Sequence, residues 1–106
     1  MLEFECRVST QVPAAHPCLA GHFPGNPVVP AVLLLDLVQD VLRAWRGPQW
    51  RLRRLLAAKF LLPLRPDQSF EIVLRLADTR LDWRCERDAH LLAEGRGEIG
   101  SGELVT

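Results

Sequence analysis

The sequence lacks an excess of either charge, because 13 Lys and Arg residues balance 13 Asp and Glu residues over 106 positions. Binding to nucleic-acid phosphates needs a basic excess, so this balance argues against a nucleic-acid partner. No segment reaches the roughly 20 apolar residues of a membrane span. The first ten residues, MLEFECRVST, also lack the basic-then-apolar order of a signal peptide. These absences predict a cytoplasmic protein without a membrane partner.

The chain has only three cysteines, and their spacing does not indicate disulfide pairs. Cys6, Cys18 and Cys85 are odd in number, lie far apart and form no C-x-x-C motif. A disulfide framework is therefore not expected, and we predict reduced thiols. His16, Cys18 and His22 match no usual spacing of metal ligands. We expect neither a metal nor another cofactor.

The length and the apolar content bound the class of protein. A chain of 106 residues without internal repeats allows one domain, which we place over residues 1–106. Its 48% apolar content is that of a folded globular protein and not of a disordered chain. A net charge of zero gives little protection against self-association. We therefore expect one folded domain that forms oligomers.

Hydrophobic periodicity predicts one helix and several strands. Residues 2–9 alternate between apolar and polar, which indicates a half-buried strand. Residues 31–46 form the one strong helix candidate, between Pro30 and the helix-stopping Gly47-Pro48. The first half of this helix is apolar on nearly all sides, so we expect it to be buried. Further strands are expected over residues 50–62, 69–77, 80–87 and 89–99. This pattern predicts an α+β fold in which an antiparallel sheet curls around the helix.

The segment from 16 to 36, HPCLAGHFPGNPVVPAVLLLD, contains the candidate site. His22 lies in a loop stiffened by prolines, and Asp36 lies 14 residues later within the helix. An imidazole on a rigid loop and a carboxylate on a buried helix can act as an acid/base pair. The first N–H groups of the helix lack intrahelical acceptors and can bind a carbonyl oxygen that gains negative charge. These groups belong to Ala31, Val32 and Leu33.

The same residues also have a purely structural interpretation. His22 could be a hydrogen-bonded loop histidine, and Asp36 could join Asp40 and Arg43 in an exposed polar stripe. Burying an aspartate without a hydrogen-bond or ionic partner costs free energy, however. If the helix is central, Asp36 must therefore have a role that offsets this cost.

Residues 21–36, GHFPGNPVVPAVLLLD, resemble the signature of the 3-hydroxyacyl-acyl-carrier-protein dehydratases of bacterial fatty-acid synthesis. In that family a GHFPGxPxxPG block precedes an acidic residue on the central helix. Lys59-Phe60 and the turn from Pro63 to Asp67 extend the resemblance more weakly. The HPCLxGHFPG form, the short chain and the VxLLD helix are most similar to the small dehydratases of aryl-polyene pigment clusters. Those enzymes act on unsaturated aryl or polyenyl chains attached to a carrier protein.

The resemblance implies a hot-dog fold, in which an antiparallel sheet wraps around the long helix. It implies a dimer whose active sites each take the histidine from one subunit and the acid from the other. His22 would remove the proton beside the thioester carbonyl, and Asp36 would protonate or polarise the leaving hydroxyl group. The backbone at the helix start would hold the enolate-like oxygen, and a hydrophobic tunnel along the helix would hold the acyl chain. The substrate-binding residues would be Gly25, Ala31, Val32 and Leu33.

The resemblance also implies an acyl carrier protein as partner. Such proteins are acidic, and the stretch from Arg43 to Lys59 holds six basic residues and no acidic one. A local basic patch on a neutral protein indicates docking to an acidic partner, although a solvated face is the alternative. Arg51, Arg53 and Arg54 are the candidate docking residues.

One position departs from the family pattern, because Ala31 replaces a glycine. Alanine would be strained if the backbone there had a positive φ, and harmless if it were helical. We expect the helical conformation. Ala31 and the small size also motivate an alternative function, a non-catalytic hot-dog subunit that binds acyl chains or completes a heterodimer with a related dehydratase. A hot-dog thioesterase is disfavoured, because the HFPG block belongs to dehydration chemistry.

Overall fold

The computed structural model describes residues 3–16 and 28–101, and every structural statement below concerns this part of the chain. It contains the expected helix and strands, which are β1 (Glu3–Thr10), α1 (Ala31–Arg46), β2 (Trp50–Phe60), β3 (Phe70–Ala77), β4 (Arg80–Arg87) and β5 (His90–Ser101). The bounds of α1 and β4 are those that the sequence predicts.

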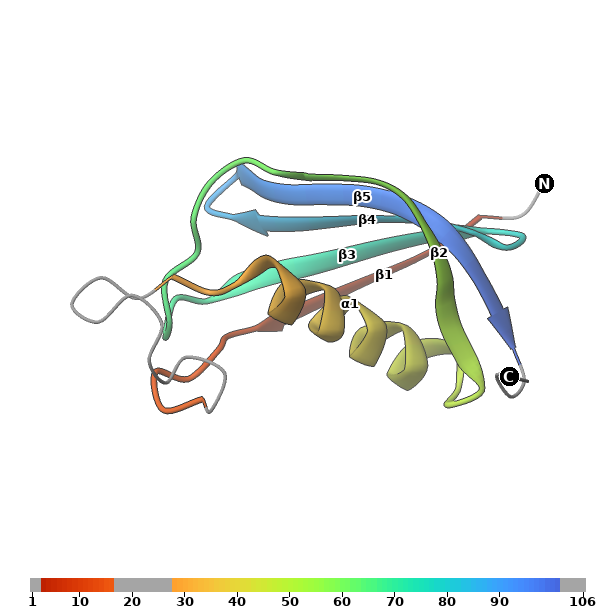
Figure 1. Ribbon diagram of the computed structural model, residues 1–106, viewed down its shortest axis with the longest axis horizontal. Coiled ribbons are helices and arrows are strands. Elements are labelled where there is room, and N and C mark those ends of the chain that lie inside the picture. Colours follow the sequence, from red (N-terminus) through yellow and green to blue (C-terminus); the bar gives the residue numbers. More distant parts are fainter. Residues whose placement is uncertain (1–2, 17–27, 102–106) are drawn as a thin grey trace.

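The five strands form one antiparallel sheet in the order β1-β3-β4-β5-β2. β3, β4 and β5 follow one another through tight turns, where Asp78 and Asp88 adopt the left-handed conformation. α1 connects the two edge strands, β1 and β2. Figure 1 shows the long strands curving over α1, which lies along the concave side of the sheet. The expected sheet around a helix is thereby confirmed.

The core lies between the concave face of the sheet and one side of α1. Successive side chains of a strand point to opposite faces, so alternate residues of β3 and β4 point towards the helix. The fully buried ones include Ile72, Leu74, Leu81, Trp83 and Cys85. The buried residues of α1 recur at helical spacing and are Leu33, Leu34, Val38 and Leu42. Burying each such leucine contributes about 1.5–3 kcal/mol.

Gly47 ends α1, as the sequence predicts. Its φ of 122° is a conformation that L side chains rarely adopt, and its N–H donates to the carbonyl of Arg43 at 2.9 Å. The helix has 16 residues, and no helix in the described part is long and apolar enough to cross a membrane.

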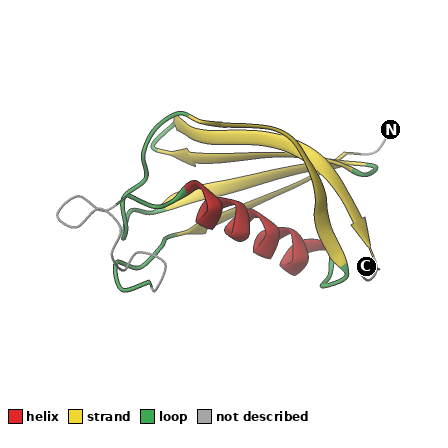
Figure 2. Ribbon diagram, in the orientation of Figure 1, coloured by secondary structure: helices red, strands yellow, loops and turns green. Residues whose placement is uncertain are grey.

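The expectation that the first half of α1 is buried on nearly all sides is wrong for the single chain. Val32 is 65% exposed, and Asp36 and Asp40 are exposed as well. One five-stranded sheet covers only one side of a helix, and the opposite side faces outward (Figure 2). Val32 on that side is therefore largely uncovered by the described residues.

Trp83 packs between the central strands and β2. Its indole is fully buried and lies 6.2 Å from the ring of Phe60, measured between centroids. The paired position on β5 is Gly95, which leaves room for the indole. The N–H of Trp83 is buried without a hydrogen-bond partner among the described residues.

Candidate functional site

Asp36 lies on the outward side of α1, one turn after Val32 and one turn before Asp40. The sequence interpretation places Asp36 on a buried helix, but its side chain is exposed in the single chain. The predicted polar stripe of Asp36, Asp40 and Arg43 does not pair Asp36 with Arg43, because the Arg43 side chain donates to the carbonyl of Pro48 at 3.3 Å instead. No hydrogen bond or ion pair joins Asp36 to another described residue. The carboxylate is therefore free to meet a substrate or a second chain.

The start of α1 presents two free N–H groups. Pro30 is the N-cap residue, with φ −64° and ψ 149°, and it offers no side-chain cap. Its carbonyl accepts the N–H of Leu33 at 3.1 Å and that of Leu34 at 3.3 Å. The expectation that Leu33 has a free N–H is therefore wrong, because the first turn closes on Pro30. Within the described residues, only Ala31 and Val32 in this turn keep an N–H without an acceptor.

Ala31 is the first residue of α1 and does not have a positive φ. The helical alternative for this position is thereby confirmed, so the methyl group that replaces the family's glycine adds no backbone strain. With a rise of about 1.5 Å per residue, Asp36 lies roughly 7–8 Å along the helix axis from Ala31. The carboxylate and the two N–H groups can thus face the same bound molecule.

His22 and Gly25 lie outside the described residues. The structure therefore positions the acid and the helix start, but it does not test the histidine or the glycine. The chain enters α1 through Val29, whose N–H donates to the carbonyl of Leu64 at 2.8 Å.

An apolar groove of about 450 Å³ runs between α1 and β1. Leu33, one of the expected substrate-binding residues, belongs to the core together with Leu34 and does not line the groove, whereas Leu37 does. The other lining residues are Cys6, Val8, Thr10, Asp40, Val41, Ala44, Trp45 and Ile72.

Arg46 lies beside this groove, between two aromatic rings. Its guanidinium carbon is 4.9 Å from the ring centroid of Phe4 and 5.4 Å from that of Trp45. This cation–π stack joins the last turn of α1 to the start of β1.

The three candidate docking arginines lie in the first half of β2 and are exposed. Arg53 donates to the carbonyl of Ser101 at 3.0 Å, and Arg54 lies 3.8 Å from Glu98. Arg51 has no partner among the described residues.

Gln39 was missed by the sequence interpretation. Its amide accepts the N–H of Leu52 at 2.7 Å and donates to the carbonyl of Trp50 at 3.1 Å, which holds this part of β2 against α1.

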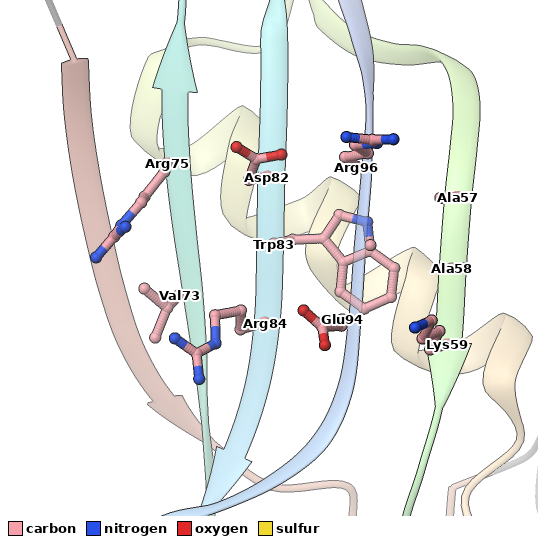
Figure 3. Close-up of a pocket in the computed structure, with 11 residues that line it drawn as sticks. Ala57, Ala58, Lys59, Val73, Arg75, Asp82, Trp83, Arg84, Glu94 and Arg96 are labelled. Atoms are coloured by element: carbon pink, nitrogen blue, oxygen red, sulfur yellow. The ribbon is translucent and has the colours of Figure 1, made fainter.

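A second hollow, of about 400 Å³, lies on the sheet and is lined mostly by charged side chains (Figure 3). Its acids and bases alternate across the strands. Glu94 pairs in register with Lys59 and Arg84, and Asp82 with Arg75 and Arg96. Opposite charges on neighbouring strands stabilise a sheet. This hollow contains no residue of α1, so we do not assign it to the candidate site.

The described residues hold no group of three His, Cys, Asp or Glu side chains that could bind a metal ion. Cys6 and Cys85 are free thiols, whereas Cys18 lies outside the described part. Burial raises the pKa of the Cys85 thiol to about 12, with a smaller contribution from the charge of Glu86. Cys85 is therefore a neutral core residue at physiological pH.

Comparison with known proteins identifies relatives. The ApeI-like family model, described as ApeI dehydratase, matches residues 3–96. A 3-hydroxyacyl-[acyl-carrier-protein] dehydratase, FabZ, from Thermomicrobium roseum is 31% identical over an alignment of 91 residues, and the match covers 74% of this chain and 61% of that protein. The chain thus spans about three-fifths of the length of this curated relative.

Solved structures share the fold. One is the dehydratase heterocomplex ApeI:P from Xenorhabdus doucetiae, with a TM-score of 0.81 and 22% identity over 90% of this chain and 86% of that chain. Another is the (R)-hydratase from A. caviae involved in PHA biosynthesis, with a TM-score of 0.69 and 16% identity over 96% and 97% of the two chains. The fold is therefore the α+β hot dog that the resemblance implied. Because the family model covers most of the chain, this protein belongs to the ApeI-like family of hot-dog dehydratases, which are related to FabZ.

Proposed function

We propose that this protein dehydrates a 3-hydroxyacyl thioester on an acyl carrier protein to the trans-2-enoyl form, in aryl-polyene or fatty-acid-type synthesis. The observation that carries the proposal is the exposed, unpaired carboxylate of Asp36 near the free N–H groups of Ala31 and Val32. Membership of a dehydratase family over residues 3–96 supports the reaction class.

The proposed mechanism is an elimination of water. His22 takes the proton from the carbon beside the thioester carbonyl, and the electron pair moves onto the carbonyl oxygen. The N–H groups of Ala31 and Val32 stabilise this negative charge, and such a donor contributes about 10²–10³-fold to the rate. The carbonyl then re-forms, the carbon–carbon double bond forms, and the hydroxyl group leaves as water with a proton from Asp36.

A second subunit completes the proposed site. β2 is an edge strand, and large apolar residues are exposed along it and just after it, namely Leu55, Leu56, Phe60, Leu61 and Leu62. Unpaired strand edges and contiguous apolar surface favour association. A partner on this edge and on the outward side of α1 would cover Val32 and exclude water from Asp36. The apolar groove beside Leu37 offers a place for the acyl chain.

An acidic carrier protein is the proposed partner of the exposed arginines of β2. Arg51 is the strongest docking candidate, because the two neighbouring arginines already contact Ser101 and Glu98.

The test uses purified protein and a 3-hydroxyacyl carrier protein, with the loss of one water followed by mass spectrometry. His22→Ala and Asp36→Asn should each abolish turnover. Asp36 forms no hydrogen bond or ion pair with a described residue of its own chain, so the free energy of unfolding of Asp36→Asn should lie within about 0.5 kcal/mol of the wild-type value. Undiminished turnover in either variant would contradict the mechanism.

Mixing the two inactive variants tests whether the site is shared between subunits. A mixed dimer has one site with both mutations and one site with neither. Random exchange of subunits should therefore restore about a quarter of the wild-type activity in a symmetric dimer. If denaturing the two variants and refolding them together restores no activity, the proposal that the subunits share each site is wrong.

A non-catalytic subunit is the second candidate function, and one observation favours it. A structural neighbour is described as a dehydratase heterocomplex, so a chain of this fold can assemble with another dehydratase. Turnover by the purified chain alone would exclude this alternative. Turnover only after addition of a related dehydratase would support it.

A further inference from the structure

The apolar groove between α1 and β1 has two distinct ends. α1 and β1 run in opposite directions, so Arg46 at the end of α1 lies over Phe4 near the start of β1 (Figure 1). The other end of the groove is lined by Leu37 of α1 and Thr10 of β1. Leu37 directly follows Asp36, the proposed acid. A chain whose reacting carbons lie at Asp36 therefore enters the groove at the Leu37 end and extends towards Arg46.

The length of the groove follows from the two elements that border it. Its lining residues on α1 extend from Leu37 to Trp45, which is roughly 12 Å at a rise of about 1.5 Å per residue. Those on β1 extend from Cys6 to Thr10, which is roughly 14 Å at about 3.4 Å per residue. An extended chain advances about 1.2 Å per bond, because a residue with three backbone bonds spans at most about 3.6 Å. The groove thus takes about 10–12 bonds of an extended acyl chain.

The groove ends where the side chain of Arg46 covers Phe4. Phe4 lies on the same face of β1 as Cys6 and Val8, because successive side chains of a strand alternate between faces. By this alternation the groove would continue over Phe4, yet Phe4 is not among its lining residues. The guanidinium carbon of Arg46 lies 4.9 Å from the centroid of the Phe4 ring and 5.4 Å from that of Trp45. Arg46 thus fills the position into which the groove would otherwise extend.

Two aromatic rings hold Arg46 at this position. A guanidinium over the face of an aromatic ring is attracted by the negative charge of that face. Arg46 forms no hydrogen bond or ion pair with another described residue, so no carboxylate draws its side chain away from Phe4 and Trp45. The closed end is therefore a property of these three side chains.

We propose that Arg46 is a specificity-determining residue, which limits the length of the acyl chain by closing the groove at its Phe4 end. The inference rests on the proposed dehydratase function, with the groove as the acyl site. About 10–12 bonds fit beyond the reacting carbons, so the preferred substrates have straight chains of up to about 14 carbons.

The experiment measures kcat/KM for a series of 3-hydroxyacyl carrier proteins whose straight chains differ by two carbons. Each CH₂ group that enters the groove should raise kcat/KM about twofold to fourfold. Beyond about 14 carbons each further CH₂ group should change kcat/KM less than about 1.5-fold. In Arg46→Ala this break in the series should move by about five to six carbons, because Phe4 lies roughly 7 Å further along β1 than Cys6.

Arg43→Ala is the matched control, because Arg43 is the other basic residue in the last turn of α1 and its side chain donates to the carbonyl of Pro48. It removes the same charge from the same turn, and the break should stay at about 14 carbons. A break at the wild-type length in Arg46→Ala would overturn the inference. An equal shift in Arg43→Ala would overturn it as well.

A second substitution of Arg46 tests closure by the bulk of the side chain. Methionine is long and unbranched and makes favourable contacts with aromatic rings, so Arg46→Met keeps the groove filled without the charge. Its break should lie within about two carbons of the wild-type break. A shift as large as that in Arg46→Ala would contradict closure by bulk. Arg46 is exposed, so both of its variants should keep the wild-type fold.

Binding of straight-chain primary alcohols distinguishes failure of this inference from failure of the proposed function. These uncharged probes can occupy an apolar groove without any reaction, and isothermal titration calorimetry measures their affinity. The affinity should rise with chain length up to about 10–12 carbons in the wild type, and for about five to six carbons more in Arg46→Ala.

The two series separate the possible failures. A wild-type protein without dehydratase activity would refute the proposed function and, with it, the limit on acyl substrates, whereas the alcohol series would still show whether Arg46 closes the groove. An active wild type would refute the role of Arg46 alone if neither series shows a break, or if Arg46→Ala shows the wild-type break in both.

Discussion

Substitution of Gly95 by alanine should be among the most damaging small changes in this sheet. A Cβ atom at Gly95 would lie 2.4 Å from Cζ2 and 2.5 Å from Cε2 of Trp83. It would also lie 2.7 Å from the carbonyl oxygen of Ala57 on β2. The indole is fully buried and the oxygen belongs to the backbone, so neither neighbour can move aside cheaply. The strain must therefore spread into the contact between β5 and β2.

The expected cost follows from the kind of atoms in contact. Overpacking a well-packed core costs about 1–3 kcal/mol, and a clash with backbone places Gly95→Ala at about 3 kcal/mol. For a domain of this size, 1 kcal/mol corresponds to about 4–8 °C in Tm, so the variant should melt about 12–24 °C below the wild type. Gly100→Ala is the matched control on the same strand. The three atoms nearest to its Cβ would belong to the flexible side chain of Arg53, and the cost should stay within about 0.5 kcal/mol.

Thermal unfolding followed by circular dichroism measures both variants, at one chain concentration because association shifts Tm. Equal melting temperatures for Gly95→Ala and Gly100→Ala would refute the packing argument. The double variant Gly95→Ala with Trp83→Leu provides a further check. Since leucine vacates the space that the new methyl group needs, the two changes should cost less together than the sum of their separate costs.

Two other predictions concern the buried thiol and the apolar groove. Because burial raises the pKa of Cys85 to about 12, above its ordinary value of 9.0, the unfolded thiol ionises first as the pH rises. The free energy of unfolding should therefore fall by about 1.4 kcal/mol per pH unit between the ordinary and the raised pKa. Urea titrations at several pH values should show a smaller fall in Cys85→Val. Ala44 lines the groove between α1 and β1, so Ala44→Phe should lower kcat/KM at least about tenfold more for long acyl chains than for short ones. Equal losses for all chain lengths in a competition assay would exclude the groove as the acyl site.

Part of the site could be recognised from the sequence, and part could not. The block around His22 and the carboxylate of Asp36 follow from a motif with fixed Gly, Pro and His positions. The structure adds that the Leu33 N–H is taken by Pro30 and that the Ala31 backbone is helical. The contacts of Gln39 have no sequence signal, because its partners lie 11 or more residues away along the chain.

The sequence by itself determined the local structure of this protein. Periods of 3.6 and 2 residues separate helix from strand, and Gly47-Pro48 stops the helix whatever surrounds it, so the bounds of α1 and β4 were predictable. Only the tertiary structure decided which surfaces are covered. The apolar start of α1 looks like a core helix in sequence, yet Val32 and Asp36 face outward because one curved sheet covers one side of it. Periodicity reports the apolar character of a face, whereas burial depends on which distant elements the fold brings against that face.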